Sequence, residues 1–353
     1  MVARDIIELI DELEEHHTLS DNDFIGLISK LKGANEEVEQ YLYNKADSVR
    51  KKIFGNDVYV RGLIEFTNYC KNDCYYCGIR RSNTDVSRYR LSKEDILQCC
   101  EIGYSMGYRT FVLQGGEDAY FTDDRICAIV SEIKKLYPDC AVTLSIGEKE
   151  YDSYKRYYEA GADRYLLRHE TANTEHYREL HPEEMLSEHR KNCLFSLKEI
   201  GYQVGCGIMV GSPGQTEQHI LEDFRFMQEL KPHMIGIGPF IPAKGTPLRD
   251  KAPGTLEDTL HILSILRLMF PKVLLPATTA LGTIHPIGRE LGIKAGANVV
   301  MPNISPVGAR EKYMLYDGKI SLSDGAEECK ANLERRMNES GYQIVVDRGD
   351  YIE

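Results

Sequence analysis

The chain has 353 residues, of which 42% are hydrophobic, enough for a large core, and its formal net charge is −12. This negative charge argues against nucleic acid or an anionic membrane as a partner, because both bind basic surfaces. Ten cysteines without regular pairing, and no apolar run near the roughly 20 residues that span a bilayer, predict a cytoplasmic protein with reduced thiols.

Residues 1–56 are expected to form a helical N-terminal extension. Apolar residues recur at helical spacing around Ile6 and again around Phe24, and a third amphipathic stretch covers residues 38–50. Ser20 or Asp21 is suited to cap the second helix. No low-complexity linker marks a separately folded domain anywhere in the chain.

From residue 57 onward, short β-type runs alternate with helical ones. The predicted strands are Val60–Phe66, Thr110–Gln114, Val142–Ile146, Arg164–Arg168, Gln203–Val210, Met234–Gly238, Val273–Ala277 and Asn298–Pro302. The predicted helices are Lys93–Met106, Asp123–Leu136, Glu150–Ala160, Glu188–Ile200, Gln218–Leu230, Leu256–Met269 and Pro286–Lys294. This alternation predicts an α/β fold with a parallel sheet, and eight β/α units close most economically into a full (β/α)8 TIM barrel over residues 57–303.

Three of these helices are followed by a glycine just before the next strand, at Gly161, Gly201 and Gly296. Glycine there fits the left-handed residue that ends a helix. Beyond the barrel, residues 304–353 are expected to be a loop-rich tail packed on it, with a last helix near Glu327–Ser340.

Cys70, Cys74 and Cys77 follow the first predicted strand at C-x3-C-x2-C spacing. A structural zinc site closes with four ligands, so three thiolates do not complete one. They can instead hold three irons of a four-iron cluster and leave the fourth iron open. The alternatives are three unrelated thiols, or a zinc site whose fourth ligand lies elsewhere.

Polar residues and glycines gather where the strands end, which is where a β/α barrel carries its active site. Gly115, Gly116 and Glu117 follow the second strand; the glycines let backbone approach a ligand, and the carboxylate can accept hydrogen bonds from an ammonium group. Met209, in the fifth strand, could pack on an adenine face, although core methionines are commoner. Other candidates at strand ends are Ser145, Thr278 and Thr279.

Charged residues alternate along the fourth strand. Arg164, Arg168 and Glu170 are expected on its barrel-facing side, where buried charges need partners. An anionic ligand would be one such partner. The alternative is an internal salt bridge from Arg168 to Glu170 or Glu148. Arg190, which opens the next helix, is a further candidate for binding a carboxylate.

The cysteine spacing, the aromatic Tyr76 before the last cysteine, and the glycine–glycine–glutamate turn one strand later resemble the radical S-adenosylmethionine (SAM) enzymes. Further strand-end runs resemble the HydE maturases of [FeFe]-hydrogenase, and the likeness extends from about residue 57 to 319. These runs are Ile64–Phe66, Leu166–Asn173, Ile235–Pro242, Pro276–Ala280 and Gly296–Asn303.

The resemblance implies that the three cysteines bind a [4Fe–4S] cluster with SAM on its open iron, and that reduction yields a 5′-deoxyadenosyl radical. It implies that Glu117 holds the methionine amine of SAM, Arg190 its carboxylate and Glu170 its ribose. The other cofactor-binding residues implied are Tyr76, Gly115, Gly116, Ser145, Met209 and Ile237. The substrate end would be lined by Arg164, Arg168, Thr278, Thr279 and Tyr313.

In that family the radical is expected to attack the sulfur of a cysteine-bound Fe(CO)2(CN) complex, with HydG and HydF as partner maturases. Some members carry a C-terminal cysteine group for an accessory cluster, but this region has only Cys329, so we expect no second cluster. Two alternatives remain open. One is a methylornithine-synthase-like or other small-molecule radical enzyme, which lysine would stimulate; the other is a non-catalytic iron–sulfur carrier, which would not bind SAM.

Overall fold

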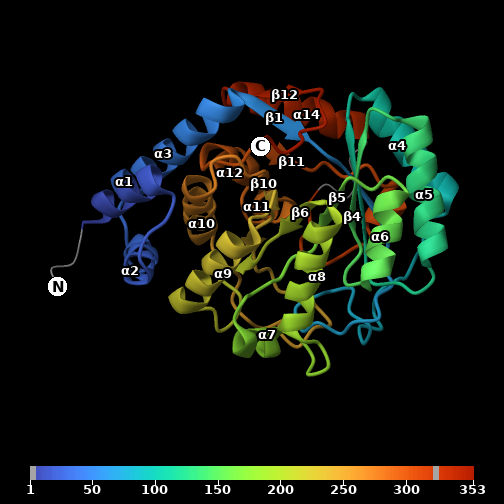
Figure 1. Ribbon diagram of the computed structural model, residues 1–353, viewed down its shortest axis with the longest axis horizontal. Helices are drawn as coiled ribbons and strands as arrows, with labels where there is room; N and C mark the ends of the chain where they lie inside the picture. Colours follow the sequence, from blue (N-terminus) through green and yellow to red (C-terminus); the bar gives the residue numbers. More distant parts are fainter. Residues whose placement is uncertain (1–4, 321–325) are drawn as a thin grey trace.

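The N-terminal extension is helical and packs on the side of the molecule. The computed structural model describes residues 5–320 and 326–353, with only the backbone of residues 326–329. Helices α1 (Ile6–His16), α2 (Asp21–Leu31) and α3 (Glu36–Phe54) confirm the predicted extension, and Ser20 caps α2 by accepting a hydrogen bond from the Asp23 amide. They pack against α9 (Glu217–Leu230) and α10 (Leu256–Met269) (Figure 1).

Short parallel strands form the centre of the fold. One sheet has the order β2 (Gly62–Thr67), β3 (Thr110–Gly115), β4 (Ala141–Ser145), β5 (Arg164–Leu166), β6 (Gln203–Cys206) and β8 (Met234–Ile235). A second has the order β10 (Pro276–Ala277), β11 (Val299–Val300), β1 (Asp57–Val60) and β12 (Gln343–Val345), and β7 (Met209–Val210) pairs with β9 (Gly238–Pro239). Single parallel bridges link Met234 of β8 to Leu274, which precedes β10, and Leu63 of β2 to Asn303, which follows β11.

The seven helices predicted between the strands are confirmed to within two residues at each end. Besides α9 and α10 they are α4 (Lys93–Ser105), α5 (Asp123–Leu136), α6 (Tyr151–Glu159), α8 (Ser187–Ile200) and α12 (Gly288–Lys294). Gly161, Gly201 and Gly296 have φ of 108°, 111° and 108°, as expected of residues that end helices. Three short helices were not predicted from the sequence: α7 (Thr174–Leu180), α11 (Thr279–Ile284) and α13 (Val307–Arg310).

Three predicted strands are each divided in two. The first is divided at Arg61, so that β1 pairs with β11 and β12 while β2 pairs with β3. The fifth is divided near Gly207, where an added Cβ would lie 1.9 Å from the Gly236 carbonyl oxygen. Neighbouring backbones therefore approach too closely for a side chain at this point. The apolar pattern did not reveal these divisions, because both halves of each strand are buried.

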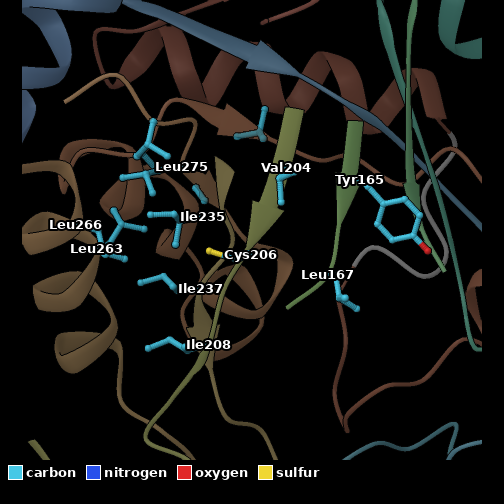
Figure 2. Packing of buried hydrophobic residues seen from close by; sticks show 14 of the residues in the cluster. Tyr165, Leu167, Val204, Cys206, Ile208, Ile235, Ile237, Leu263, Leu266 and Leu275 are labelled. Carbon is cyan, nitrogen blue, oxygen red and sulfur yellow. The ribbon is translucent and has the colours of Figure 1, made fainter. Parts of the chain in front are cut away.

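Side chains on the outer faces of the strands pack against the surrounding helices. Figure 2 shows Ile235 and Ile237 on the side of Leu263 and Leu266, which belong to α10. Ile237 is fully buried in this hydrophobic core. The Ile237 side chain therefore faces outward, away from the cavity, so a cofactor contact of Ile237 stays a prediction for its backbone alone.

Arg164 lies at the N-terminal end of β5, at the opposite end of the strands from the polar cluster. It donates hydrogen bonds to the Arg348 carbonyl at 2.8 Å and to Thr110 Oγ1 at 3.0 Å, and it forms a 2.5 Å ion pair with Asp350. The expectation that Arg164 lines the substrate end is therefore wrong: the C-terminal segment supplies its counter-charge.

This segment also adds β12, a strand that pairs with β1 and that the sequence analysis missed. The predicted last helix is confirmed as α14 (Ala326–Glu339). Within the described residues, no helix combines the length and apolar composition needed to cross a membrane.

Asp350→Asn is expected to lower the free energy of unfolding at neutral pH by about 1 kcal/mol, a small effect because Asp350 is partly exposed. Although burial raises the pKa of Asp350, hydrogen bonds from Arg348 and Arg164 lower it to about 2. A carboxyl whose pKa is depressed on folding stabilises the fold above its unfolded pKa of about 3.9, and this contribution is lost as the pH falls through the folded pKa. Urea titrations of both proteins should therefore show a stability difference that shrinks between about pH 4 and pH 2. A constant difference would show that the charge of Asp350 is not what stabilises the fold.

Candidate active site

The cysteine loop and the glycine–glycine–glutamate turn form one structural unit. The loop leaves β2, the turn leaves the adjacent β3, and the Lys71 amide donates a 2.9 Å hydrogen bond to the Glu117 carbonyl. The Glu117 amide in turn donates to Cys70 Sγ at 3.4 Å. A Cβ on Gly116 would lie 2.2 Å from the Tyr69 carbonyl oxygen, so only glycine permits this approach. Two motifs that lie apart in the sequence therefore meet at the ends of adjacent strands.

The three cysteines of the loop fit a cluster better than a single metal ion. Burial raises the pKa of all three thiols, that of Cys74 to about 12, so a bound cation is needed to hold them as thiolates. Among the described residues, no three His, Cys, Asp or Glu side chains converge on one ion. A structural zinc site closes with four ligands, whereas the open iron of a four-iron cluster leaves three irons for three cysteines, so the donor set of this loop suits the cluster.

A cavity of about 320 Å³ opens at the C-terminal ends of the strands, beside the cysteine loop. It brings together most of the residues that the sequence analysis selected. Those that line it are Tyr76, Cys77, Gly115, Ser145, Arg168, Glu170, Arg190, Met209, Thr278, Thr279 and Tyr313. Cys70, Cys74, Gly116 and Glu117 lie outside its walls, in the cysteine loop and the adjoining turn.

The charged residues of the cavity are partly paired with one another. Arg168 Nη2 lies 3.1 Å from Glu170 Oε2, so the internal salt bridge considered as an alternative is present. Arg190 Nε donates a 2.6 Å hydrogen bond to Glu148 Oε1 and Nη1 donates to the Arg168 carbonyl at 3.3 Å. These pairs hold the two guanidinium groups in place at the cavity wall.

Several buried polar atoms of the cavity wall have no hydrogen-bond partner among the described residues. They include Thr278 Oγ1, Arg168 Nε and Glu170 Oε2, whose contact with Arg168 lacks hydrogen-bond geometry. Leaving a buried donor or acceptor unsatisfied costs about 1–3 kcal/mol. Since these three atoms belong to residues that line one cavity, a polar ligand bound there could complement them.

Glu117 is buried and placed to receive an ammonium group. Its Oε1 accepts a 3.0 Å hydrogen bond from the Glu148 amide, and its Oε2 lies 3.1 Å from Lys71 Nζ. The Lys71 side chain is 64% exposed, so a ligand ammonium can replace it at Glu117 with little loss. The structure thus fits the expected binding of the SAM amine.

The cavity wall holds a second charged pair that was not predicted from the sequence. Glu65 Oε1 lies 2.5 Å from Lys319 Nζ, and Glu65 Oε2 accepts a 2.6 Å hydrogen bond from Asn303. Both charged side chains are buried and line the cavity. Glu65 could have been selected because it is a glutamate inside an apolar strand. Nothing local in the C-terminal tail distinguished Lys319. Gln114 and Tyr316 also line the cavity and were not selected.

Cys329, on which the expectation of no second cluster rests, lies in α14, but its side chain is outside the described residues. That expectation remains a prediction.

Comparisons with known proteins agree with this geometry. Residues 64–227 match the radical SAM superfamily. The chain is 44% identical, over 93% of its length and 92% of the relative, to the [FeFe] hydrogenase maturase subunit HydE of Thermotoga maritima. It superposes on the crystal structure of methylornithine synthase (PylB) with a TM-score of 0.83 and 30% identity, covering 96% of this chain and 97% of that one. It also shares the fold of the hydrogenase maturase HydG, at a TM-score of 0.81 and 19% identity, covering 98% of this chain and 77% of that one. The chain belongs to the radical SAM superfamily and, within it, is an enzyme of the HydE hydrogenase-maturase type, a membership that implies a [4Fe–4S] cluster and SAM.

Proposed function

We propose that this enzyme acts in assembly of the [FeFe]-hydrogenase H-cluster, on the sulfur of a cysteine-bound Fe(CO)2(CN) precursor. The observation that carries the proposal is the 44% identity to HydE over nearly the whole of both chains. The cavity supports it, because Arg168 and the unpartnered Thr278 hydroxyl suit a small anionic ligand. HydG and HydF are the proposed partners, and the cytoplasm is the proposed compartment.

In this proposal Cys70, Cys74 and Cys77 hold the cluster. When bound, the cluster and SAM supply reductive cleavage of the sulfonium and a 5′-deoxyadenosyl radical. Glu117 holds the methionine amine, and Arg190, oriented by Glu148, holds the carboxylate. The other proposed contacts to SAM are Glu170 at the ribose, the side chains of Tyr76, Ser145 and Met209, and the backbone of Gly115 and Gly116.

The chain's own residues at the substrate end position the ligand and exclude water. Arg168, Thr278, Thr279 and Tyr313 are the proposed contacts, and the buried wall around them keeps solvent from a reactive radical. Tyr313 is held by a 3.4 Å hydrogen bond that Gln114 Nε2 donates to its hydroxyl. Arg164 has no part in this proposal, since its partners lie at the other end of the strands.

We also propose that the parallel strands form a complete barrel. The single bridges between Met234 and Leu274 and between Leu63 and Asn303 support closure on both sides. A complete barrel would enclose the cavity on all sides and leave its C-terminal mouth as the route for ligands. The proposed boundaries are a helical extension at 1–56, the barrel at 57–303, and a tail at 304–353 that packs on it.

The second candidate is a methylornithine-synthase-like enzyme, which the 30% identity and TM-score of 0.83 to PylB favour. Formation of 5′-deoxyadenosine by the anaerobically reconstituted enzyme distinguishes the two. We expect the cysteine-bound iron complex to stimulate its formation and lysine to have no effect. Stimulation by lysine instead would overturn the maturase proposal. The carrier hypothesis is set aside because the chain is a radical SAM enzyme of the HydE type.

Arg168→Ala is expected to lower product formation about 10–100-fold, since hydrogen bonds to charged groups contribute about 1.5–3 kcal/mol. Iron content should stay unchanged, because Arg168 contacts Glu170 and the Ile208 carbonyl and no cluster cysteine. Product per 5′-deoxyadenosine and iron per chain are the two measurements, with the exposed Arg335→Ala as the control. An equal fall in iron content would mean that Arg168 has a structural role.

A further inference from the structure

Glu170 adopts a backbone conformation that its own sequence does not favour. Its φ is 66°, in the left-handed region, which costs a non-glycine residue of order 1–2 kcal/mol. The other two such residues in the described part of the chain, His17 and Lys231, end helices α1 and α9. Glu170 ends no helix; it follows β5 and lines the cavity. Strain of this kind persists only where surrounding structure holds it, and it concentrates at functional sites.

Contacts on both sides of Glu170 hold this turn. The Glu170 amide donates a 3.0 Å hydrogen bond to the Gly207 carbonyl, and Glu170 forms a parallel bridge with Ile208. On the N-terminal side, the Gly207 amide donates to His169 Nδ1 at 3.4 Å. On the C-terminal side, the Ala172 amide donates a 2.5 Å hydrogen bond to Asp223 Oδ1.

Asp223 contacts residues on both the N-terminal and the C-terminal side of Glu170. It lies on α9, is fully buried, and has its Oδ1 3.3 Å from His169 Nε2. The Gly207 amide thus occupies Nδ1 of His169, while Nε2 lies in contact with the Asp223 carboxylate without hydrogen-bond geometry. One carboxylate group thus contacts the residue before Glu170 and the amide two residues after it.

Stability of the helix does not explain an aspartate at this position. Its neighbours Phe224 and Phe226 are buried in the core, where an apolar side chain would pack without desolvating a charge. Asp223 Oδ2 also has no hydrogen-bond partner among the described residues. A buried carboxylate that is only partly compensated is costly, so its presence points to a role beyond folding.

We propose that Asp223 is a positioning residue: through His169 and the Ala172 amide it holds Glu170 in the left-handed conformation that directs its carboxylate into the cavity. The inference rests on the proposed function, in which Glu170 contacts the ribose of SAM. Asp223 itself contacts neither the cavity nor the cysteine loop. It acts on the cofactor only through the turn.

The test is a double-mutant cycle on the reconstituted enzyme with Asp223→Asn, Glu170→Gln and the combination of the two. Asp223→Asn should raise the KM for SAM about tenfold, leave kcat within about twofold, and leave iron per chain unchanged. Glu229→Gln, which removes an exposed charge from the same helix, is the matched control and should behave like the wild type.

If Asp223 acts through Glu170, the combined variant should bind SAM no more weakly than Glu170→Gln alone. Losses that add, or unchanged affinity in Asp223→Asn, would overturn the proposal. Normal SAM affinity in Glu170→Gln would instead overturn the assignment of Glu170 itself.

Hydrogen exchange of residues 167–174 without SAM provides a second readout that does not depend on activity. Asp223→Asn should speed exchange in this segment, because the Ala172 amide loses its charged acceptor. Unchanged exchange would overturn the positioning role whatever happens to SAM binding. Faster exchange with normal SAM affinity would show that the order of this turn does not affect cofactor binding, and it would also overturn the proposal.

Discussion

Replacement of Cys74 by alanine is expected to abolish both the intact cluster and the formation of 5′-deoxyadenosine. Cys74 lies between Cys70 and Cys77 in the loop that meets the glycine–glycine–glutamate turn, and with two thiolates the loop leaves a second iron without a protein ligand. Without an intact four-iron cluster, no electron can be delivered to SAM to cleave it. We expect 5′-deoxyadenosine to fall to the background of the assay and the visible absorbance of the cluster to disappear.

Iron and sulfide analysis after anaerobic reconstitution, together with chromatography of 5′-deoxyadenosine, measures both effects. Cys127→Ser is the matched control, because Cys127 lies on α5 and its thiol contacts the Arg156 carbonyl, outside the cysteine loop. It should retain full cluster content and activity. Continued SAM cleavage by Cys74→Ala would refute the assignment of the three cysteines to the cluster.

Lys319→Met should lower the free energy of unfolding by about 3–5 kcal/mol, because it leaves Glu65 buried without its counter-ion. Glu65 is 1% exposed, and burial already raises the pKa of its carboxyl while Lys319 and Asn303 lower it. Lys319 Nζ also donates a 3.0 Å hydrogen bond to the Tyr313 carbonyl, so its loss should loosen a wall of the cavity. Denaturant titration measures the stability change, and exposed Lys272→Met is the control.

The double variant Glu65→Gln with Lys319→Met separates charge from packing. Replacing both members of a buried ion pair by neutral side chains of similar size is often nearly neutral, whereas removing one is costly. The double variant should therefore recover most of the stability lost in Lys319→Met. If it is as unstable as the single variant, the Lys319 ammonium group contributes through its hydrogen bond to Tyr313 rather than through the pair.

The sequence by itself determined the class of fold and the identity of the cluster motif. Periodicity of apolar residues located most of the predicted helices, because a long helix with one buried face repeats its pattern several times. The cysteine spacing needed no tertiary information, since all three cysteines lie within one short loop. Glu117 could also be selected, because its two preceding glycines and its position after a strand are local features.

Only the tertiary structure decided which charged partner each side chain at a strand end meets. Arg164 and Arg168 belong to the same predicted strand with the same alternation, yet one meets Asp350 and the other Glu170 at the cavity. Four residues of an extended strand span about 13 Å, enough to separate the two ends of a barrel. The alternation of residues predicts on which face of a strand a side chain lies, but not at which end of the barrel it lies.

The pairing of Glu65 with Lys319 joins residues 254 positions apart, and that of His169 with Asp223 joins a strand end to an outer helix. No local pattern encodes such partners, because they depend on which elements the chain brings together when the parallel strands assemble. Local periodicity therefore predicted most of the helices and strands, and cysteine spacing identified the loop. The ion pairs that shape the cavity and hold Glu170 were decided by the packing of segments distant in sequence.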